Sequence, residues 1–198
     1  MNTGFMYWFP GFYQHIVHSV YGPDFYSRYN AISDLLPDKT SVVDVCCGDC
    51  YLYNFLKGKH IDYLGLDLNL KFIKYAKKNG IHAELFNLNN EKIPEADYII
   101  MQGSLYQFIP RHRQIIDKLF DSAHLGVVIS ESVRNIASNN NSIVSFLANL
   151  ATRVNGNNFF QRFTREELLG LFYEYNVGQI KEIRGGRDLI GFFIRKNS

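Results

Sequence analysis

The chain has 198 residues, of which 46% are hydrophobic and 20% charged, which suits one globular domain, 1–198, and leaves too little length for a second full domain. Its net charge of +2 is too small for the extended basic surface of a protein that binds the nucleic-acid backbone. No run approaches about 18 apolar residues, and no basic stretch precedes an apolar one at the N-terminus, so we expect a soluble, cytoplasmic protein without a membrane span.

The predicted elements alternate between helices and strands. A helix at 24–36 comes first, with Asp24 placed to cap it and Pro37 to end it. It is followed in chain order by a strand at 41–46, a helix at 51–56, a strand at 61–66, a helix at 69–78, strands at 81–86 and 97–101, a helix at 110–123 and a strand at 125–130. This alternation predicts an α/β fold with a mostly parallel sheet covered by helices on both faces.

The pattern changes after residue 130. Helical apolar spacing at 142–154 predicts an inserted helix over the carboxyl edge of the sheet. Thr164 and Glu167 form a capping-box pattern at the start of a helix that runs to about residue 175. Runs at 179–184 and 189–194, joined by two glycines, predict a C-terminal antiparallel hairpin. We therefore divide the domain into an aromatic N-terminal arm and helix (1–38), a core (40–135), an insert (136–163) and a C-terminal helix and hairpin (164–198).

Polar residues follow the first three predicted strands. Asp44 precedes a tight turn that contains Gly48, Asp67 ends the second strand, and Asn87 follows the third. Ligands of open parallel sheets bind at this edge. An acid about twenty residues beyond a glycine turn is placed to accept the ribose hydroxyls of a nucleoside, which fits Asp67. Asp44 adds a negative charge that favours an amine or a sulfonium and repels a pyrophosphate.

Four sequence runs, VVDVCCGDC, YLGLDLN, ELFNLNN and ADYIIMQGSLYQF, together resemble the first four motifs of class I (Rossmann-like) S-adenosylmethionine-dependent methyltransferases, over about residues 40–135. The resemblance implies a three-layer Rossmann-like methyltransferase sheet, S-adenosyl-L-methionine as cofactor and a small, partly apolar acceptor. It also implies roles for residues of this chain: Asp44 and the turn from Cys46 to Gly48 for the methionine part, Asp67 for the ribose, Asn87 for the adenine amino group, Leu68 and Leu88 beside them, and Met101 and Gln102 at the edge of the methyl site.

The turn after the first strand departs from the pattern of that family. Cys46 and Cys50 stand where glycine is usual, so each needs a backbone angle that suits glycine better. Asn87 stands where Asp is more usual and keeps one acceptor for an amino group. Cys47 and Cys50 also form a CxxC, which leaves a metal or redox site open beside small residues fitting a cramped loop. Because no second ligand pair exists, no metal is expected, and three clustered cysteines fit a reducing compartment.

The acceptor site is predicted from residues around these motifs. If the acceptor is a hydroxyl, the candidate general bases are His18, Tyr106 and Glu131. The candidate substrate contacts are Tyr21, Arg134 and Arg162, because a guanidinium suits a carboxylate or a phosphate. Two aromatic-rich segments, 7–21 and 142–163, are expected to roof this site, although packing alone is an alternative role for both.

Three other functions compete with a small-molecule methyltransferase. An NAD(P)-dependent oxidoreductase needs G-x-G-x-x-G, which this turn lacks. A methyltransferase-like binding or assembly module without activity is the second alternative, suggested by Cys46 and Cys50. Methylation of protein or nucleic acid is the third; the Asn/Asp-Pro-Pro-aromatic segment of enzymes that methylate base amines is absent at 102–105, and no nucleic-acid partner is expected. The sequence specifies no oligomeric state.

Overall fold

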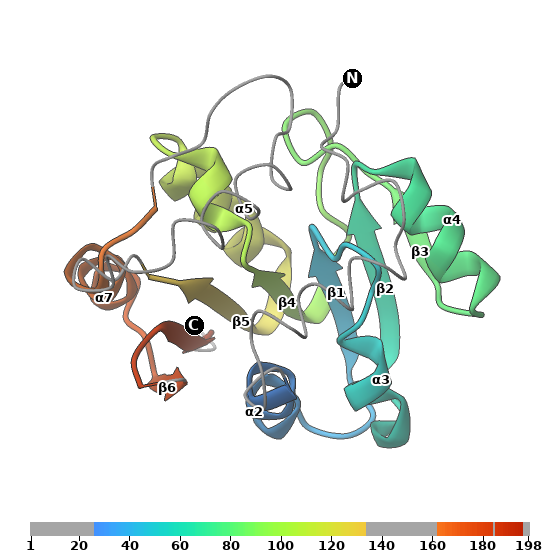
Figure 1. Ribbon diagram of the computed structural model, residues 1–198, viewed down its shortest axis with the longest axis horizontal. Coiled ribbons are helices and arrows are strands. Elements are labelled where there is room, and N and C mark those ends of the chain that lie inside the picture. The colour runs from blue at the N-terminus through green and yellow to red at the C-terminus, as the bar shows by residue number, and fades with distance from the viewer. Residues whose placement is uncertain (1–25, 134–161, 184, 196–198) are drawn as a thin grey trace, which may run out of the picture.

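A seven-stranded sheet organises the computed structural model of the protein, which describes residues 26–133, 162–183 and 185–195 (Figure 1). The strands are β1 (Ser41–Val45), β2 (Asp62–Asp67), β3 (Ala83–Leu85), β4 (Ala96–Gln102), β5 (Ala123–Ser132), β6 (Gln179–Ile183) and β7 (Asp188–Ile194). The helices described are α2 (Ser27–Leu35), α3 (Tyr53–Leu56), α4 (Leu70–Lys78), α5 (His112–Ser122) and α7 (Arg165–Glu174), with 3-10 helices η3 (Lys57–Lys59) and η4 (Leu105–Phe108).

The strand order of the sheet is β3-β2-β1-β4-β5-β7-β6. Strands β1 to β5 run parallel to their neighbours, whereas β7 is antiparallel to both β5 and β6. The predicted mostly parallel sheet with a C-terminal antiparallel hairpin is therefore confirmed. The chain moves outward from β1 in one direction to β2 and β3 and in the other to β4 and β5. In sheets with such a reversal, ligands usually bind beyond the carboxyl ends of the strands where the order reverses, here β1 and β4.

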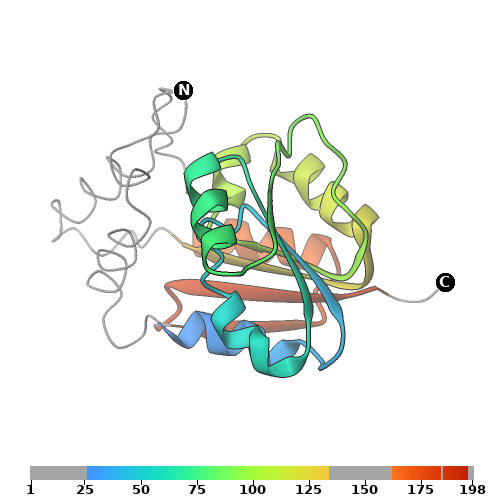
Figure 2. The ribbon, with the colours of Figure 1, turned by 90° about the vertical axis from the view of Figure 1, so that its right-hand side faces the viewer.

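The two faces of the sheet are buried by different helices (Figure 2). On β1, Val43 and Val45 belong to the apolar cluster that α5 and α7 complete. Val42, the intervening residue, belongs to the cluster that contains residues of α2, α3 and α4. This alternation follows from the two-residue period of a strand. Residues that alternate near the carboxyl ends of the strands consequently face one or the other layer of helices.

Local signals placed several boundaries correctly. The side chain of Asn69 accepts a hydrogen bond from the Lys71 N–H and caps α4. Thr164 and Glu167 form the reciprocal capping box at the start of α7 that the sequence predicts. The boundary between α5 and β5 differs from the prediction, because Ala123 begins the strand instead of ending the helix. Ala123 pairs with Ala96 of β4 and is fully buried, so pairing in the sheet outweighs the helix propensity of alanine.

Some sequence predictions concern residues outside the described ranges. These are the Asp24 cap, the aromatic segment 7–21 and the inserted helix at 142–154. Within the described ranges, no helix is both long enough and apolar enough to cross a membrane.

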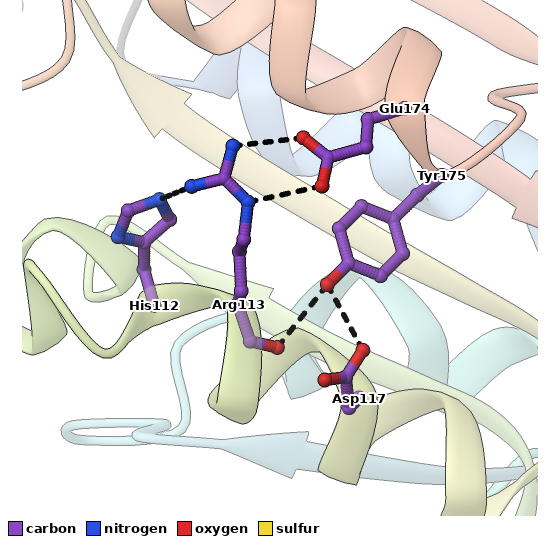
Figure 3. Close-up of polar contacts among 5 residues, drawn as sticks. All are labelled: His112, Arg113, Asp117, Glu174 and Tyr175. Carbon is purple, nitrogen blue, oxygen red and sulfur yellow. Dashed lines mark hydrogen bonds and ion pairs between the residues drawn. The ribbon is translucent and has the colours of Figure 1, made fainter.

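Polar contacts join α7 to α5 (Figure 3). The Arg113 guanidinium donates to both carboxylate oxygens of Glu174, at 2.9 and 2.8 Å. The Tyr175 hydroxyl donates to Asp117 Oδ1 at 2.9 Å. Because the Arg113 and Glu174 side chains are about half exposed, solvent screening makes their ion pair a minor contribution to stability. Burial of Phe172, which packs in the apolar cluster below α7, contributes more.

Candidate functional site

The turn that follows β1 has the backbone of a glycine-rich loop. Cys46, Gly48 and Cys50 have φ angles of 58°, 58° and 60°, all in the left-handed region. For a residue with a Cβ this conformation costs about 1–2 kcal/mol. The two cysteines thus adopt the backbone angles that glycine would adopt more easily.

Asp67, at the end of β2, holds this turn in place. Its Oδ2 accepts a hydrogen bond from the Gly48 N–H at 2.9 Å, and its Oδ1 accepts one from the Asn69 N–H at 2.7 Å. Burial raises the pKa of Asp67 to about 6 against the lowering effect of these two bonds. Each carboxylate oxygen has a second lone pair, so Asp67 keeps two acceptor positions for the hydroxyls of a ribose.

Asp44 is a buried carboxylate with one unsatisfied oxygen. Its Oδ2 accepts a hydrogen bond from the Tyr63 hydroxyl at 2.9 Å, while its Oδ1 has no hydrogen-bond partner within the described part of the chain. Burial raises its pKa to about 7, and the nearby amide of Gln102 opposes that rise. The side-chain oxygen of Gln102 is likewise buried without a partner. Two orphan acceptors therefore lie at the carboxyl ends of β1 and β4, where the parallel register sets these strands side by side.

The charges at this edge are predominantly negative. Asp67 and Asp49 each raise the pKa of Asp44, and the carboxylates of Asp44, Asp67 and Glu131 raise the pKa of the Cys46 thiol together with its burial. A ligand with a positive charge would relieve this repulsion. A neutral Cys46 thiol is also a poor nucleophile, so the arrangement favours binding rather than cysteine chemistry.

The cysteines of the CxxC are packed thiols. Sγ of Cys50 lies 3.3 Å from Sγ of Cys47, and both residues are free cysteines. A methyl group at Gly65 of β2 would lie 2.5 Å from the first of these sulfurs and 3.0 Å from the second, so the pair fills the space above the glycine. Burial and the neighbouring Cys50 raise the pKa of Cys47. Among the residues that the structure describes, no group of three His, Cys, Asp or Glu side chains could hold a metal ion.

Other predicted cofactor residues occupy varied environments. Met101 is fully buried and Leu88 is buried, both in the apolar cluster on the α5 face, so their side chains serve packing. Leu68 is 38% exposed at the carboxyl end of β2. Asn87 accepts a hydrogen bond from the Asn89 N–H at 3.1 Å, as an asparagine in a turn commonly does.

Three predicted acceptor-site residues do come together. Glu131 of β5 is fully buried, and its Oε1 accepts a hydrogen bond from the Leu105 N–H at the start of η4. The guanidinium of Arg162 lies over the ring of Tyr106, 4.1 Å from its centroid. The positive charge of Arg162 lowers the pKa of Glu131, although burial outweighs it and raises that pKa to about 7. His18, Tyr21 and Arg134 lie outside the described residues.

Arg28 of α2 is a site residue that sequence reasoning missed. Its Nη1 would lie 3.7 Å from a methyl group at Gly103, just beyond the carboxyl end of β4, and its charge acts on Glu131. The available signal was its position: Arg28 precedes Ile32 by one helical turn and therefore shares the apolar face of the helix. A charged residue on a buried helical face is unusual enough to mark a candidate.

Comparisons with known proteins agree with this architecture. A family model described as methionine biosynthesis protein MetW matches residues 26–132. No curated protein matches the sequence of the chain. Among solved structures, magnesium protoporphyrin IX methyltransferase from Synechocystis PCC 6803 with bound SAH is 12% identical, with a TM-score of 0.65 over 87% of this chain and 84% of that chain.

Two further structures have the same fold. A SAM-dependent methyltransferase from Aquifex aeolicus is 12% identical, with a TM-score of 0.59 over 90% of this chain and 96% of that chain. A complex between the Haloferax volcanii Trm112 methyltransferase activator and a candidate methyltransferase gives 10% identity and a TM-score of 0.72, with 100% of both matched chains covered. At such identities the similarity concerns the fold alone. This fold is that of the class I methyltransferases, whose sequence motifs this chain resembles.

Proposed function

Because the chain belongs to the family of the methionine biosynthesis protein MetW and has the class I methyltransferase fold, we propose that it binds S-adenosyl-L-methionine and transfers the methyl group to a small, partly apolar acceptor. The observation that carries the proposal is the pair of buried oxygens of Asp44 and Gln102 beside the left-handed turn, which have no partner among residues 26–133, 162–183 and 185–195. An unpaired buried acceptor costs about 1–3 kcal/mol, which a ligand with N–H donors would recover.

The residues present fit this cofactor. Asp44 Oδ1 and the Gln102 oxygen suit the ammonium group of its methionine part, and Arg28 is near enough to Gly103 to suit the carboxylate of the same part. Asp67 suits the ribose hydroxyls. The Asn87 side-chain oxygen accepts from the N–H and the side-chain amide of Asn89, at 3.1 and 3.3 Å, so it would exchange one of these bonds to accept from the adenine amino group. The negative charge of the site suits the sulfonium. SAH bound to the Synechocystis enzyme supports the choice of ligand class by analogy of fold.

The cofactor would supply an electrophilic methyl group, and the chain would supply position. Methyl transfer is an in-line displacement, so the main contributions of the protein are orientation and exclusion of water. Asp44, Asp67 and the turn between them would orient the donor against the ends of β1 and β2. Tyr106 and Glu131, which follow β4 and end β5, are the described residues placed to orient the acceptor or take its proton.

Calorimetry with S-adenosylhomocysteine tests the proposal. We expect a single site per chain, and competition with S-adenosylmethionine for that site. NAD⁺ serves as the control ligand, because its pyrophosphate would meet the negative charge of Asp44 and no G-x-G-x-x-G is present. Absence of binding, or equal binding of NAD⁺, would contradict the proposal.

A methyltransferase-like module without activity is the second candidate, suggested by the cysteines of the turn. It shares the cofactor site and differs in outcome. Binding of S-adenosylhomocysteine together with no methyl transfer from radiolabelled S-adenosylmethionine to a cell extract freed of this protein would favour the module. Transfer of label to a small molecule in that extract would favour the enzyme.

A further inference from the structure

The side chain of Arg162 has unused hydrogen-bonding capacity. Its guanidinium stacks over Tyr106, and within the described ranges it forms neither a hydrogen bond nor an ion pair. Stacking engages the face of the guanidinium and leaves its N–H edges available for a planar oxyanion, to which they can donate two parallel bonds. The buried neighbour Phe163 and the capping box that begins at Thr164 hold the adjacent backbone in place.

Glu131 has unused capacity to accept hydrogen bonds. Its Oε1 accepts from the Leu105 N–H, but its Oε2 is buried and has no partner in the described part of the chain. The side chain as a whole is 0% exposed. A buried carboxylate oxygen without a donor is rare in a native protein, so this position suits a hydrogen-bond donor of a ligand.

Both groups border the same short element. Glu131 contacts the first residue of η4, Leu105, and Arg162 covers the second, Tyr106. The element directly follows Gly103 and Ser104 at the carboxyl end of β4. Glu131 also acts electrostatically on Cys46 in the turn after β1. A molecule held between Arg162 and Glu131 would therefore lie beside the proposed cofactor site.

We propose that the acceptor is a small aromatic acid with a phenolic hydroxyl, an inference that rests on the proposed function. Its carboxylate binds Arg162, and its hydroxyl donates to Glu131 Oε2. The anion is assigned by the Arg162 guanidinium and the hydroxyl by Glu131 Oε2, since neither group has a hydrogen-bond partner among the described residues. A phenol is chosen over an aliphatic alcohol because a carboxylate is a weak base and transfers protons efficiently only from a comparatively acidic hydroxyl.

In this reaction the phenolic oxygen forms a bond to the methyl carbon while the bond between that carbon and the cofactor sulfur breaks. The electron pair of the broken bond leaves with the sulfur. The proton of the hydroxyl passes to Oε2 of Glu131, which later releases it to water. The products are the methyl ether of the acid and S-adenosylhomocysteine, so atoms and charge balance without an additional reactant.

The test uses the full-length chain saturated with S-adenosylhomocysteine and the three isomers of hydroxybenzoate, each paired with its methyl ester. We expect at least one isomer to bind more than tenfold more tightly than its ester in calorimetry, because only the acid offers a carboxylate. Arg162→Gln should reduce that preference to within about twofold. Arg113→Gln is the control, since it removes the same charge from an exposed pair with Glu174.

A second measurement follows turnover of the isomer that binds. Glu131→Gln should still bind the acid, since an amide retains the oxygen, but should form methyl ether at least a hundredfold more slowly. Equal binding of acids and esters, failure of all three isomers to bind, or an unchanged preference in Arg162→Gln would each overturn the inference. If S-adenosylhomocysteine itself does not bind the wild-type chain, the proposed function has failed, so the two failures are distinguishable.

Discussion

Oδ2 of Asp67 accepts a hydrogen bond from the backbone N–H of Gly48 at 2.9 Å, so the acid at the end of β2 holds the turn that follows β1. The same carboxylate is proposed to receive the ribose hydroxyls. Removing it should therefore have two effects, one on the ligand-free turn and one on the bound ligand.

We expect Asp67→Ala to weaken binding of S-adenosylhomocysteine by about 1.5–3 kcal/mol, the range for charge-assisted hydrogen bonds. Calorimetry measures this loss. Asp62→Ala is the matched control, because Asp62 begins the same strand and is exposed at the opposite end. Equal affinity of wild type and Asp67→Ala would show that the ligand does not contact Asp67.

The raised pKa of Asp44 predicts a pH dependence of ligand affinity. Its pKa is raised from 3.8 to about 7, mainly by burial. A cationic ligand group favours the ionised form, so binding should release a proton, and affinity for S-adenosylhomocysteine should rise by up to about tenfold between about pH 6 and pH 8. Calorimetry in buffers of different ionisation enthalpy measures both the affinity and the number of protons released on binding. Asp44→Asn should bind more weakly and lose most of the dependence.

The stability of the ligand-free protein should fall over the pH range in which the affinity for the ligand rises. Because the folded pKa of Asp44 lies above its unfolded value of 3.8, folding takes up a proton at intermediate pH. The stabilisation from the protonated carboxyl is complete below 3.8 and is lost as the pH rises through about 7. The free energy of unfolding of the wild type should therefore fall relative to that of Asp44→Asn between about pH 5 and pH 8, as urea titrations would show. A pH-independent difference would argue against the raised pKa.

Arg28 should contribute to binding only through the methionine part of the ligand. Arg28→Ala should weaken S-adenosylhomocysteine about tenfold or more, as expected for a lost charge-assisted bond. Affinity for 5′-methylthioadenosine, which lacks the amino acid group, should stay the same. If both ligands lose affinity equally, Arg28 shapes the site without contacting the carboxylate. Arg28→Lys, which keeps the charge without the planar fork, should give an intermediate loss for S-adenosylhomocysteine.

The space above Gly65 is filled by sulfur. A Cβ at this position would lie 2.5 Å from Cys50 Sγ, so Gly65→Ala should lower the free energy of unfolding by about 1–3 kcal/mol. Combining it with Cys50→Gly should recover part of the loss, because the sulfur is removed and a left-handed residue becomes glycine. Urea unfolding of the four proteins gives the coupling. Gly58→Ala is the control, since nothing lies within 4 Å of the added methyl.

Cys50 tests whether a thiol of the turn contacts the cofactor. The sequence predicts that Cys50→Gly keeps or improves cofactor affinity, and the φ of 60° at this residue provides the reason. Loss of the buried thiol offsets part of the relief, so the stability of this single variant should change little. A large loss of S-adenosylhomocysteine binding in Cys50→Gly would instead assign the thiol a direct role.

Local chemistry in the sequence was sufficient for the order of the core elements and the cofactor edge. Asn69 and the Thr164 box act within a few residues, and hydrophobic periodicity distinguishes strand from helix over similarly short windows. Asp44 and Asp67 could be placed at one edge because parallel strands of a βαβ chain end on the same side. A left-handed backbone at Cys46 could be expected, because glycine is usual at this position in the family.

Only the tertiary structure decided which side chains meet around η4. The hydrogen bond from Leu105 to Glu131 joins residues 26 positions apart, one at the start of η4 and the other on β5. Arg162 reaches Tyr106 because α7 packs against α5, and Arg28 reaches the end of β4 because α2 covers the opposite face. These contacts depend on the packing of helices onto the seven-stranded sheet, which no local pattern encodes. The sequence alone therefore determined the edge of the sheet at which we propose the cofactor site, and the fold determined the proposed acceptor site.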